Sequence, residues 1–346
     1  MEFKNDLGKP WRYEEGDFTV VRTSMWSPPG CHPVGCGLKL YVDKEGRLDH
    51  VEGDENNPIT KGRLCVRCLA LKDYLYNPSR VIHPMKRARE DRGKDKWEQI
   101  TMDEAYELCI QMVKDTTEKY GAKSICTGAG TGRNATWQSN VLGQGAFGTP
   151  NDNCGMLAGN CCYTPRMQGM NAVLGDTFIA DCGQLNEARF DHPEYRRPDL
   201  FMIWGNNPLR ANADGFFGHW IIDCMRRGSE LFVVDPQVTW LSAHAKLYIQ
   251  VRPGTDAALA LAIGHVMIEE DLYDHDFVDR WCYGFDEFAQ RLNDPEKGMT
   301  PEKAAGICEV PVEDIYQAAR RYATAKPATI AWGLALDQNQ NGNQAG

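Results

Sequence analysis

Four cysteines in two pairs near the N-terminus constrain the fold of this chain more than any other feature. Cys31 and Cys36 lie in a loop rich in Gly, Pro and His, and Cys65 and Cys68 lie in the later stretch KGRLCVRC. Four thiolates in such pairs bind zinc in small ribbon folds, although the 28 residues between these pairs are long for a ribbon. Iron–sulfur clusters also take four thiolates. Spacing alone therefore leaves zinc, an iron–sulfur cluster and free thiols open.

The composition excludes several classes of function. A net charge of -10 argues against wide contact with nucleic acid, whose phosphates attract Lys and Arg. No apolar run reaches the length of about 18 residues that a membrane span needs. The N-terminus is polar and acidic and lacks the basic start and apolar core of a secretion signal. We therefore expect a cytoplasmic protein, in which the 13 cysteines do not form disulfides.

The sequence pattern changes near residue 85 and divides the chain into two predicted domains. Residues 1–85 are rich in Gly, Pro and Cys and contain only short strand-like runs. Residues 86–346 alternate between strands and helices, which predicts an α/β fold with a doubly wound, mostly parallel sheet. Strands are expected at 123–128, 200–205, 230–235, 247–251 and 328–332, and helices at 101–120, 215–227, 255–271 and 311–325.

Polar and Gly-containing motifs follow three of the predicted strands. Ligands of an open parallel sheet bind beyond the carboxyl ends of its strands. A helix that starts there offers free N–H groups to phosphate, an acid after a strand suits ribose hydroxyls, and Asp256 can accept hydrogen bonds from a guanine edge. Each motif alone is typical of a turn or a helix cap, but their order predicts a nucleotide site. The candidate residues are Trp204, Gly205, Asn206, Asn207, Pro208, Asp235, Pro236, Gly254, Thr255 and Asp256.

Longer motifs resemble a known enzyme family. WSPPGCHPVGCG and KGRLCVRC, then WGNNP and VRPGTDAALALAIGHVMIEEDLYDHDFVDRWCYGF, are similar in order and spacing to the molybdopterin oxidoreductases of the dimethyl sulfoxide reductase family. The resemblance implies a [4Fe-4S] cluster domain at 1–85 and a region at 86–346 that binds molybdopterin guanine dinucleotide. It also implies molybdenum or tungsten held by two such pterins. The nearest branches are those of acetylene hydratase and of the catechol dehydroxylases.

The cysteine pattern departs from that family at several positions. Relatives with WSPPGCH usually carry a first cysteine where Met25 stands, space the next two as C-x3-C, and have Gly in place of Cys68. The resemblance thus implies Cys31, Cys36 and Cys65 as cluster ligands. Cys68 is the candidate for the fourth ligand, and His32 is the alternative.

Two further roles follow from the resemblance. Arg67 falls where the family has a cation between cluster and pterin, although a surface ion pair is the alternative for it. The stretch 151–166 corresponds to the segment that donates a side chain to the metal, and Cys161 and Cys162 are its candidate ligands. A buried structural pair is the alternative for these two thiols, and Leu157 is another position that aligns with the ligand.

The predicted function is that of a molybdenum or tungsten bis-pterin oxidoreductase. An electron donor such as a ferredoxin-like iron–sulfur subunit would reduce the cluster, and the metal would remove a phenolic hydroxyl from a small catechol-type substrate. Two alternatives stay open. One is a non-redox hydratase resembling acetylene hydratase, and the other is a zinc-stabilised nucleotide-binding module or inactive fragment without catalysis.

The chain ends soon after its last predicted strand, 328–332, whereas the enzymes it resembles are much longer. We therefore expect the C-terminal half that closes over the second pterin to be missing, and the chain alone to be inactive. For the same reason we expect an exposed sheet edge or apolar face near residues 328–336.

Overall fold

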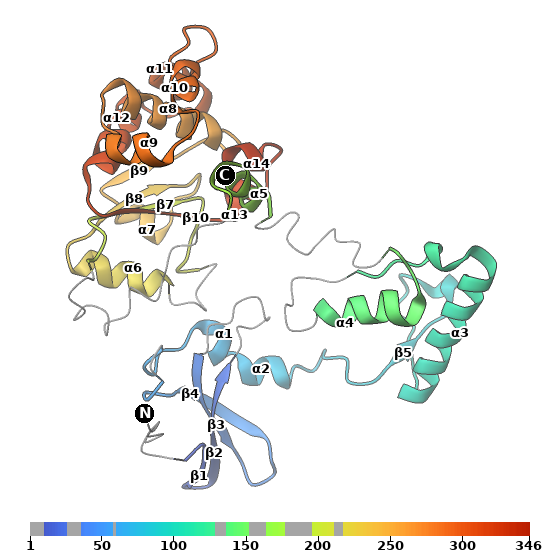
Figure 1. The fold of residues 1–346 in the computed structure, drawn as a ribbon. Helices are drawn as coiled ribbons and strands as arrows, with labels where there is room; N and C mark the ends of the chain where they lie inside the picture. The colour runs from blue at the N-terminus through green and yellow to red at the C-terminus, as the bar shows by residue number, and fades with distance from the viewer. Residues whose placement is uncertain are drawn as a thin grey trace. The chain divides into compact units, whose positions relative to one another are not determined.

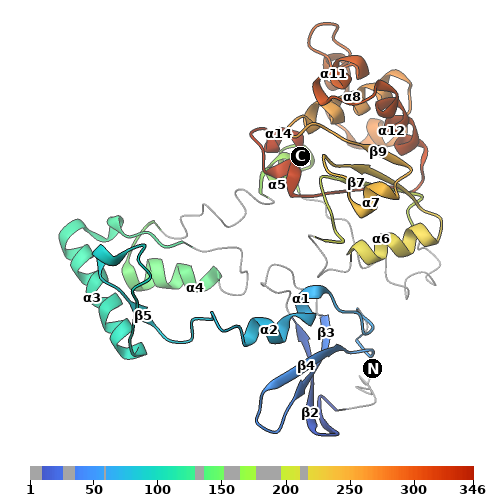
Figure 2. The same ribbon diagram turned by 180° about the vertical axis from the view of Figure 1, so that it is seen from behind.

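The computed structural model describes residues 10–25, 36–57, 60–128, 136–151, 164–176, 196–210 and 217–346. Its contacts divide the chain into two compact units, residues 1–158 and 159–346. This division differs from the domain boundary expected between residues 85 and 86, which stays a prediction. Figures 1 and 2 show the ribbon from opposite sides.

The first unit begins with a four-stranded antiparallel sheet. Its strands, in spatial order, are β1 (Arg12–Glu15), β2 (Phe18–Met25), β3 (Cys36–Val42) and β4 (Leu48–Gly53). Cys36 and Leu38 are alternate residues of β3, so they point to the same face, and both are fully buried. Two short helices, α1 (Val66–Leu69) and α2 (Leu71–Leu75), contact β4 (Figure 2).

The rest of the first unit is mainly helical in the described residues. The helix predicted at 101–120 is confirmed as α3. The Thr101 hydroxyl accepts a hydrogen bond from the Glu104 amide at its start, and Gly121, with φ of 80°, ends it. The elements are β5 (Met85–Lys86), η1 (Arg89–Asp91), β6 (Glu98–Gln99), α3 (Met102–Tyr120), η2 (Ala122–Ser124), α4 (Thr136–Asn140) and the π-helix η3 (Val141–Phe147).

The strand predicted at 123–128 is wrong. The chain forms a 3-10 turn over η2 and then continues to residue 128 without regular structure. The hydroxyl of Thr149 donates to the carbonyl of Ile125, and the side-chain amide of Asn151 donates to that of Lys123, each at 2.6 Å. These side chains take carbonyl groups that a neighbouring strand would need, so the β-propensity of the run is not realised.

The second unit is built on a four-stranded parallel sheet. In spatial order its strands are β10 (Ala328–Trp332), β7 (Leu200–Trp204), β8 (Glu230–Val234) and β9 (Leu247–Ile249). All four lie where the sequence predicts strands, and their parallel pairing confirms the predicted α/β class. Every residue of β7 is buried, as expected of a strand that is covered on both faces.

Helices supply the rest of the second unit. They are α5 (Thr164–Leu174), α6 (Phe217–Arg226), α7 (Trp240–Ala243), α8 (Asp256–Glu269), α9 (His275–Trp281), α10 (Phe285–Leu292), α11 (Pro301–Cys308), α12 (Val312–Thr324), α13 (Leu334–Asp337) and α14 (Gly342–Ala345). The helices predicted at 215–227, 255–271 and 311–325 are confirmed as α6, α8 and α12. None of the helices in the described ranges has the length and apolar character that a membrane crossing requires.

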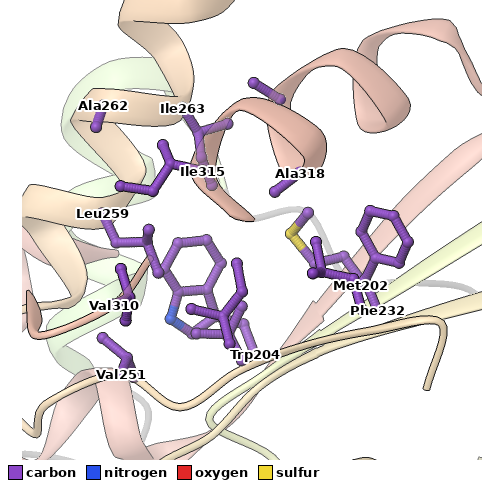
Figure 3. Packing of buried hydrophobic residues seen from close by; sticks show 14 of the residues in the cluster. Met202, Trp204, Phe232, Val251, Leu259, Ala262, Ile263, Val310, Ile315 and Ala318 are labelled. Carbon is purple, nitrogen blue, oxygen red and sulfur yellow. The ribbon is translucent and has the colours of Figure 1, made fainter. Parts of the chain in front are cut away.

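The main hydrophobic core lies between the sheet and two of these helices. Leu259 and Ile263 of α8 and Ile315 of α12 pack with Met202 and Trp204 of β7 (Figure 3). Both ribbon views place α6 on the opposite side of the sheet from α8 and α12 (Figures 1 and 2). The sheet is therefore covered on both faces, as the predicted doubly wound architecture requires.

β10 is the edge strand expected near residues 328–336. Within the described part of the chain it pairs only with β7. Its side chains do not form the exposed apolar face that we expected, because Ala328, Ile330 and Trp332 are partly buried against the core.

We expect Gly333→Ala to destabilise the second unit. A Cβ at position 333 would collide with the carbonyl oxygen of Gly205 and the side chain of Asn206, where β7 and β10 end side by side. Overpacking of this kind costs about 1–3 kcal/mol. Urea unfolding measures the change against wild type.

Gly306→Ala is the matched control for this substitution. Gly306 lies in α11, and no neighbouring atom lies within 4 Å of the position that its Cβ would take. Alanine in a helix should therefore stabilise the protein by about 0.5–1 kcal/mol. Equal unfolding midpoints for the two variants would contradict the close approach at Gly333.

Candidate cofactor site

Three of the four predicted cluster cysteines come together in the first unit. Cys36 begins β3, Cys65 is the N-cap of α1, and Cys68 lies within α1. Their exposed fractions are 0%, 6% and 0%. Hydrogen bonding with Cys36, burial and the nearby Cys65 thiol raise the pKa of Cys68 well above its usual range. Cys31 lies outside the described residues, and the ligand roles of all four stay predictions.

The local fold explains how these thiols meet. Cys65 and Cys68 are three residues apart around one helical turn, a spacing that places two side chains on the same face. The Cys68 amide donates to the Cys65 carbonyl at 3.1 Å. The β2–β3 register sets Met25 directly opposite Cys36, so the backbone position where relatives carry their first cysteine lies beside this group.

The donor chemistry fits an iron–sulfur cluster. Thiolates are the protein ligands of [4Fe-4S] clusters, and metal binding favours the ionised form of a buried thiol. Arg67 lies between Cys65 and Cys68 and is half-buried, and its relay role stays a prediction. Within the described ranges, no three His, Cys, Asp or Glu side chains are grouped as a site for a single metal ion.

The predicted nucleotide-site residues gather at the carboxyl edge of the parallel sheet. All ten lie between the end of β7 and the first turn of α8, in segments that follow β7, β8 and β9. Gly205 and Gly254 have φ of 58° and 82°, values that favour glycine and let the chain turn sharply after its strand. The Gly205 amide donates to the Val234 carbonyl at 2.8 Å, which joins the ends of β7 and β8.

Burial at this edge perturbs two polar side chains. Asp235 is 9% exposed, and burial raises the pKa of its carboxyl, although the Gln237 amide donates to it at 2.8 Å. Tyr248 of β9 has a buried hydroxyl with no hydrogen-bond partner among the described residues. Burial, followed by the charge of Asp235, raises the pKa of Tyr248. Sequence reasoning missed Tyr248, because a residue in an apolar strand run is typical of the core.

Asp256 does not act as a helix cap, although its Gly-Thr-Asp motif is typical of one. It is the first residue of α8, and its Oδ1 accepts a hydrogen bond from the Trp204 indole nitrogen at 2.9 Å. Both side chains are buried. Thr255 is the N-cap, but its hydroxyl donates to the Arg252 carbonyl at 2.7 Å and does not cap the helix. The bond to Trp204 leaves one carboxylate oxygen of Asp256 for a ligand.

The candidate metal ligands Cys161 and Cys162 lie outside the described residues. The helix that follows them, α5, is anchored at its first turn. The Arg166 amide donates to Asp337 Oδ1 at 3.0 Å, and its guanidinium donates to the Trp332 carbonyl at 3.0 Å. The start of α5 is therefore fixed at the carboxyl end of β10, on the same sheet edge as the nucleotide-site residues.

We expect Asp256→Ala and Asp256→Asn to differ in stability. Alanine leaves the buried Trp204 N–H without an acceptor, which costs about 1–3 kcal/mol. Asparagine keeps an acceptor oxygen at the same place, so most of that loss should be avoided. Thermal unfolding of the two variants, followed by Trp fluorescence, tests this. Equal losses would mean that the hydrogen bond does not hold α8 to the sheet.

The chain is similar in sequence to several known enzymes. It is 26% identical over 309 residues to acetylene hydratase of Syntrophotalea acetylenica, covering 89% of this chain and 40% of that protein. It is 30% identical to formate dehydrogenase H of Escherichia coli K12, covering 89% and 41%. It is 29% identical to the dimethyl sulfoxide reductase DmsA of the same organism, covering 90% and 40%. The chain thus spans about 40% of the length of these relatives.

A solved structure and two family matches agree with these relatives. Acetylene hydratase from Pelobacter acetylenicus superposes with a TM-score of 0.74 at 24% identity, covering 94% of this chain and 41% of that one, and shares the fold. The family described as Molybdopterin oxidoreductase Fe4S4 domain matches residues 29–77, and Molybdopterin oxidoreductase matches residues 80–345. These domains indicate a [4Fe-4S] cluster and a molybdenum or tungsten bis-pterin cofactor. The chain belongs to the molybdopterin oxidoreductases.

Proposed function

We propose that the protein carrying this chain reductively removes a hydroxyl group from a catechol-type phenol. The reaction replaces C–OH by C–H, consumes two electrons and two protons, and releases water. The grouping of Cys36, Cys65 and Cys68 carries the redox part of the proposal, because a cluster held there can relay electrons from an external donor. The phenolic substrate rests on the likeness of WSPPGCH and KGRLCVRC to catechol dehydroxylases.

The bound metal would supply the chemistry of oxygen removal, and the chain's residues would bind the cofactors and relay electrons between them. We assign cluster binding to Cys36, Cys65 and Cys68 together with Cys31, and the relay between cluster and pterin to Arg67. Cys162 or Cys161 is the proposed metal ligand. The anchoring of α5 through Arg166 supports this assignment, because the helix that follows these thiols starts at the cofactor edge of the sheet.

The guanine dinucleotide form of the pterin is part of the proposal. Asp235 would bind ribose hydroxyls, and the amides at the start of α8 would bind phosphate. The second oxygen of Asp256 would accept a hydrogen bond from guanine. A ferredoxin-like electron donor and a cytoplasmic location stay predictions.

Two other functions are alternatives to dehydroxylation. Non-redox hydration of acetylene is the second candidate, because acetylene hydratase is among the similar proteins in both sequence and fold. A zinc-stabilised module without catalysis is disfavoured, because the match over residues 29–77 is to an Fe4S4 domain.

We expect the protein carrying this chain, produced anaerobically with molybdate or tungstate, to convert catechol to phenol with a low-potential donor, whereas the chain alone should be inactive. One catechol should be consumed for every two electrons. Cys68→Ser should abolish this turnover by removing a cluster thiolate, whereas Cys282→Ser, at an exposed cysteine of the second unit, should leave it unchanged. Conversion of acetylene to acetaldehyde without donor oxidation would favour the hydratase. Failure of a protein with full cofactor content to consume catechol would refute the assignment of catechol as the substrate.

We expect Asp235→Asn to stabilise the cofactor-free protein and to weaken cofactor retention. Burial raises the pKa of Asp235, so the folded state holds its proton more tightly than the unfolded state. The ionised carboxylate therefore destabilises the fold increasingly as the pH rises above the ordinary aspartate pKa of about 4.

The stability gain of Asp235→Asn should thus be present at pH 7 and vanish on acidification below pH of about 4. Asparagine keeps an oxygen for the Gln237 amide, so local structure is preserved. Denaturation across this pH range measures the stability effect, and pterin content measures retention. A variant that retains pterin as well as wild type would show that Asp235 does not bind the cofactor.

A further inference from the structure

A closed loop separates the two segments that carry the described cluster cysteines. Its described parts are residues 54–57, directly after β4, and residues 60–62, and two residues lie between Gly62 and Cys65. The Asp54 carbonyl accepts hydrogen bonds from the Asn57 amide at 3.0 Å and from the Gly62 amide at 2.9 Å, which closes the loop on itself. The position of Cys65 therefore depends on the contacts that hold this loop.

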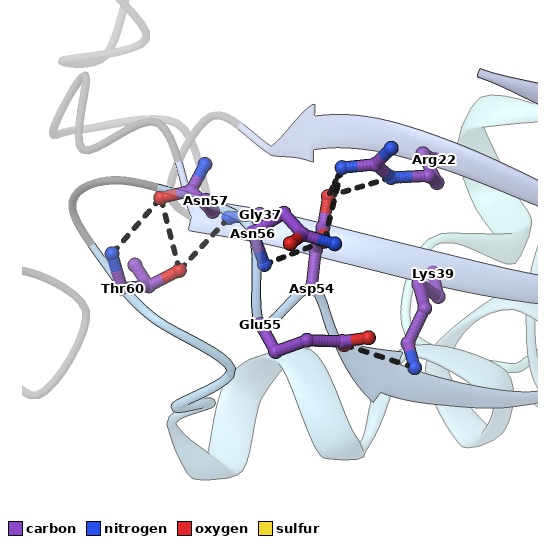
Figure 4. Close-up of polar contacts among 8 residues, drawn as sticks. All are labelled: Arg22, Gly37, Lys39, Asp54, Glu55, Asn56, Asn57 and Thr60. Atoms are coloured by element: carbon purple, nitrogen blue, oxygen red, sulfur yellow. Dashed lines mark hydrogen bonds and ion pairs between the residues drawn. The ribbon is translucent and has the colours of Figure 1, made fainter. Parts of the chain in front are cut away.

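The loop is fastened to Gly37, the residue that follows Cys36. The Gly37 amide donates to Thr60 Oγ1 at 3.2 Å, and the Thr60 hydroxyl donates onward to Asn57 Oδ1 at 3.2 Å (Figure 4). The Gly37 carbonyl accepts from the Asp54 amide at 3.0 Å. Both backbone groups of Gly37 are thus held by the loop. Thr60 is 1% exposed, so its hydroxyl has no water to replace these partners.

The contact at Gly37 is too close for any side chain. A Cβ there would collide with the Cβ, Cγ and Nδ2 atoms of Asn57. The Asn57 side chain also accepts from the Thr60 amide at 2.9 Å, which fixes the orientation of its oxygen. Since the Thr60 hydroxyl donates to that oxygen, its lone pairs face the Gly37 amide.

A buried ion pair holds the other end of the loop. Arg22 of β2 binds Asp54 with Nε–Oδ2 and Nη2–Oδ1 distances of 2.9 and 3.2 Å (Figure 4). The two side chains are 7% and 9% exposed. This bidentate bond fixes the start of the loop to β2, and the Thr60 hydrogen bonds hold its other end to Gly37.

We propose that Thr60, oriented by Asn57, is a positioning residue for the [4Fe-4S] cluster: its hydroxyl holds the Gly37 amide and thereby sets Cys36 against the Cys65–Cys68 turn. It also withholds the Gly37 N–H from the neighbouring Cys36 thiolate. Hydrogen bonds to ligand sulfurs and partners outside the ligand set tune cluster potentials and metal retention. Thr60 therefore controls both the retention and the potential of the cluster.

The test compares Thr60→Val with wild type in protein purified anaerobically with its cluster. Valine matches the shape of threonine but cannot accept the Gly37 hydrogen bond. We expect a chelator to remove the cluster roughly 10-fold faster, the factor that corresponds to leaving one buried amide unpaired. We expect the midpoint potential, followed by EPR, to shift upward, because the released Gly37 N–H can donate to the Cys36 thiolate.

Two variants distinguish positioning from general stability. Thr60→Ser keeps the hydroxyl and should restore wild-type retention and potential. Thr149→Val removes an equally buried hydroxyl of the same unit, whose hydrogen bonds reach Ile125 and Asn151 and none of the predicted ligands. It should lower the melting temperature and leave the cluster potential unchanged.

The proposal is overturned if Thr60→Val retains its cluster at the wild-type rate with an unshifted potential, or if Thr60→Ser is as impaired as valine. If Thr60→Val does not fold, Asn57→Ala takes its place. That change removes the acceptor of the Thr60 hydroxyl. It should change cluster retention and midpoint potential in the same direction as Thr60→Val, but by a smaller amount. Wild-type retention and potential in this variant would again overturn the proposal. No readout uses substrate turnover, so a failed dehydroxylation assay is distinguishable from a failure of this inference.

Discussion

The parallel run of β7, β8, β9 and β10 is the constraint on which the second unit depends. Because the strands are parallel, the segments that follow them all begin at one edge of the sheet, and the helices that connect the strands cover both faces of the sheet. Polar groups that meet a ligand are then confined to that edge. The bond from Trp204 to Asp256 ties the edge to α8. The shape of the carboxyl edge of the sheet and the packing of the main core are consequently parts of one arrangement.

The first unit organises its site by a different principle. Its sheet buries few apolar side chains, and its cysteines are brought together by loops that polar contacts define. The pair between Arg22 and Asp54 is buried, and such pairs favour one geometry more than they add stability. A domain built in this way draws much of its folding free energy from the metal that it binds. Cluster loss and unfolding are therefore closely coupled in this unit.

Local sequence patterns predicted the elements well and the pairings between distant polar groups poorly. The apolar run LFMIW and the capping residue Thr101 carry enough information to place a buried strand and a helix. The run at 123–128 has the composition of a strand, yet side chains 24 and 28 residues further along take its carbonyl groups. The hydrogen-bond partner of Asp256 lies 52 residues away, so its motif did not indicate the bond to Trp204. Such pairings depend on tertiary packing, which short motifs do not encode.

The anchoring of α5 has a consequence for the order in which the second unit forms. The amide of Arg166 meets Asp337 across 171 positions of sequence, and this contact depends on β10 having paired with β7. Closing so long a stretch of chain carries a large entropic cost, and a nascent chain emerges at about 5–20 residues per second. The helix therefore waits roughly 10 to 30 seconds for its partner during synthesis. Seating of α5 is a late step, and until then one wall of the sheet edge stays open.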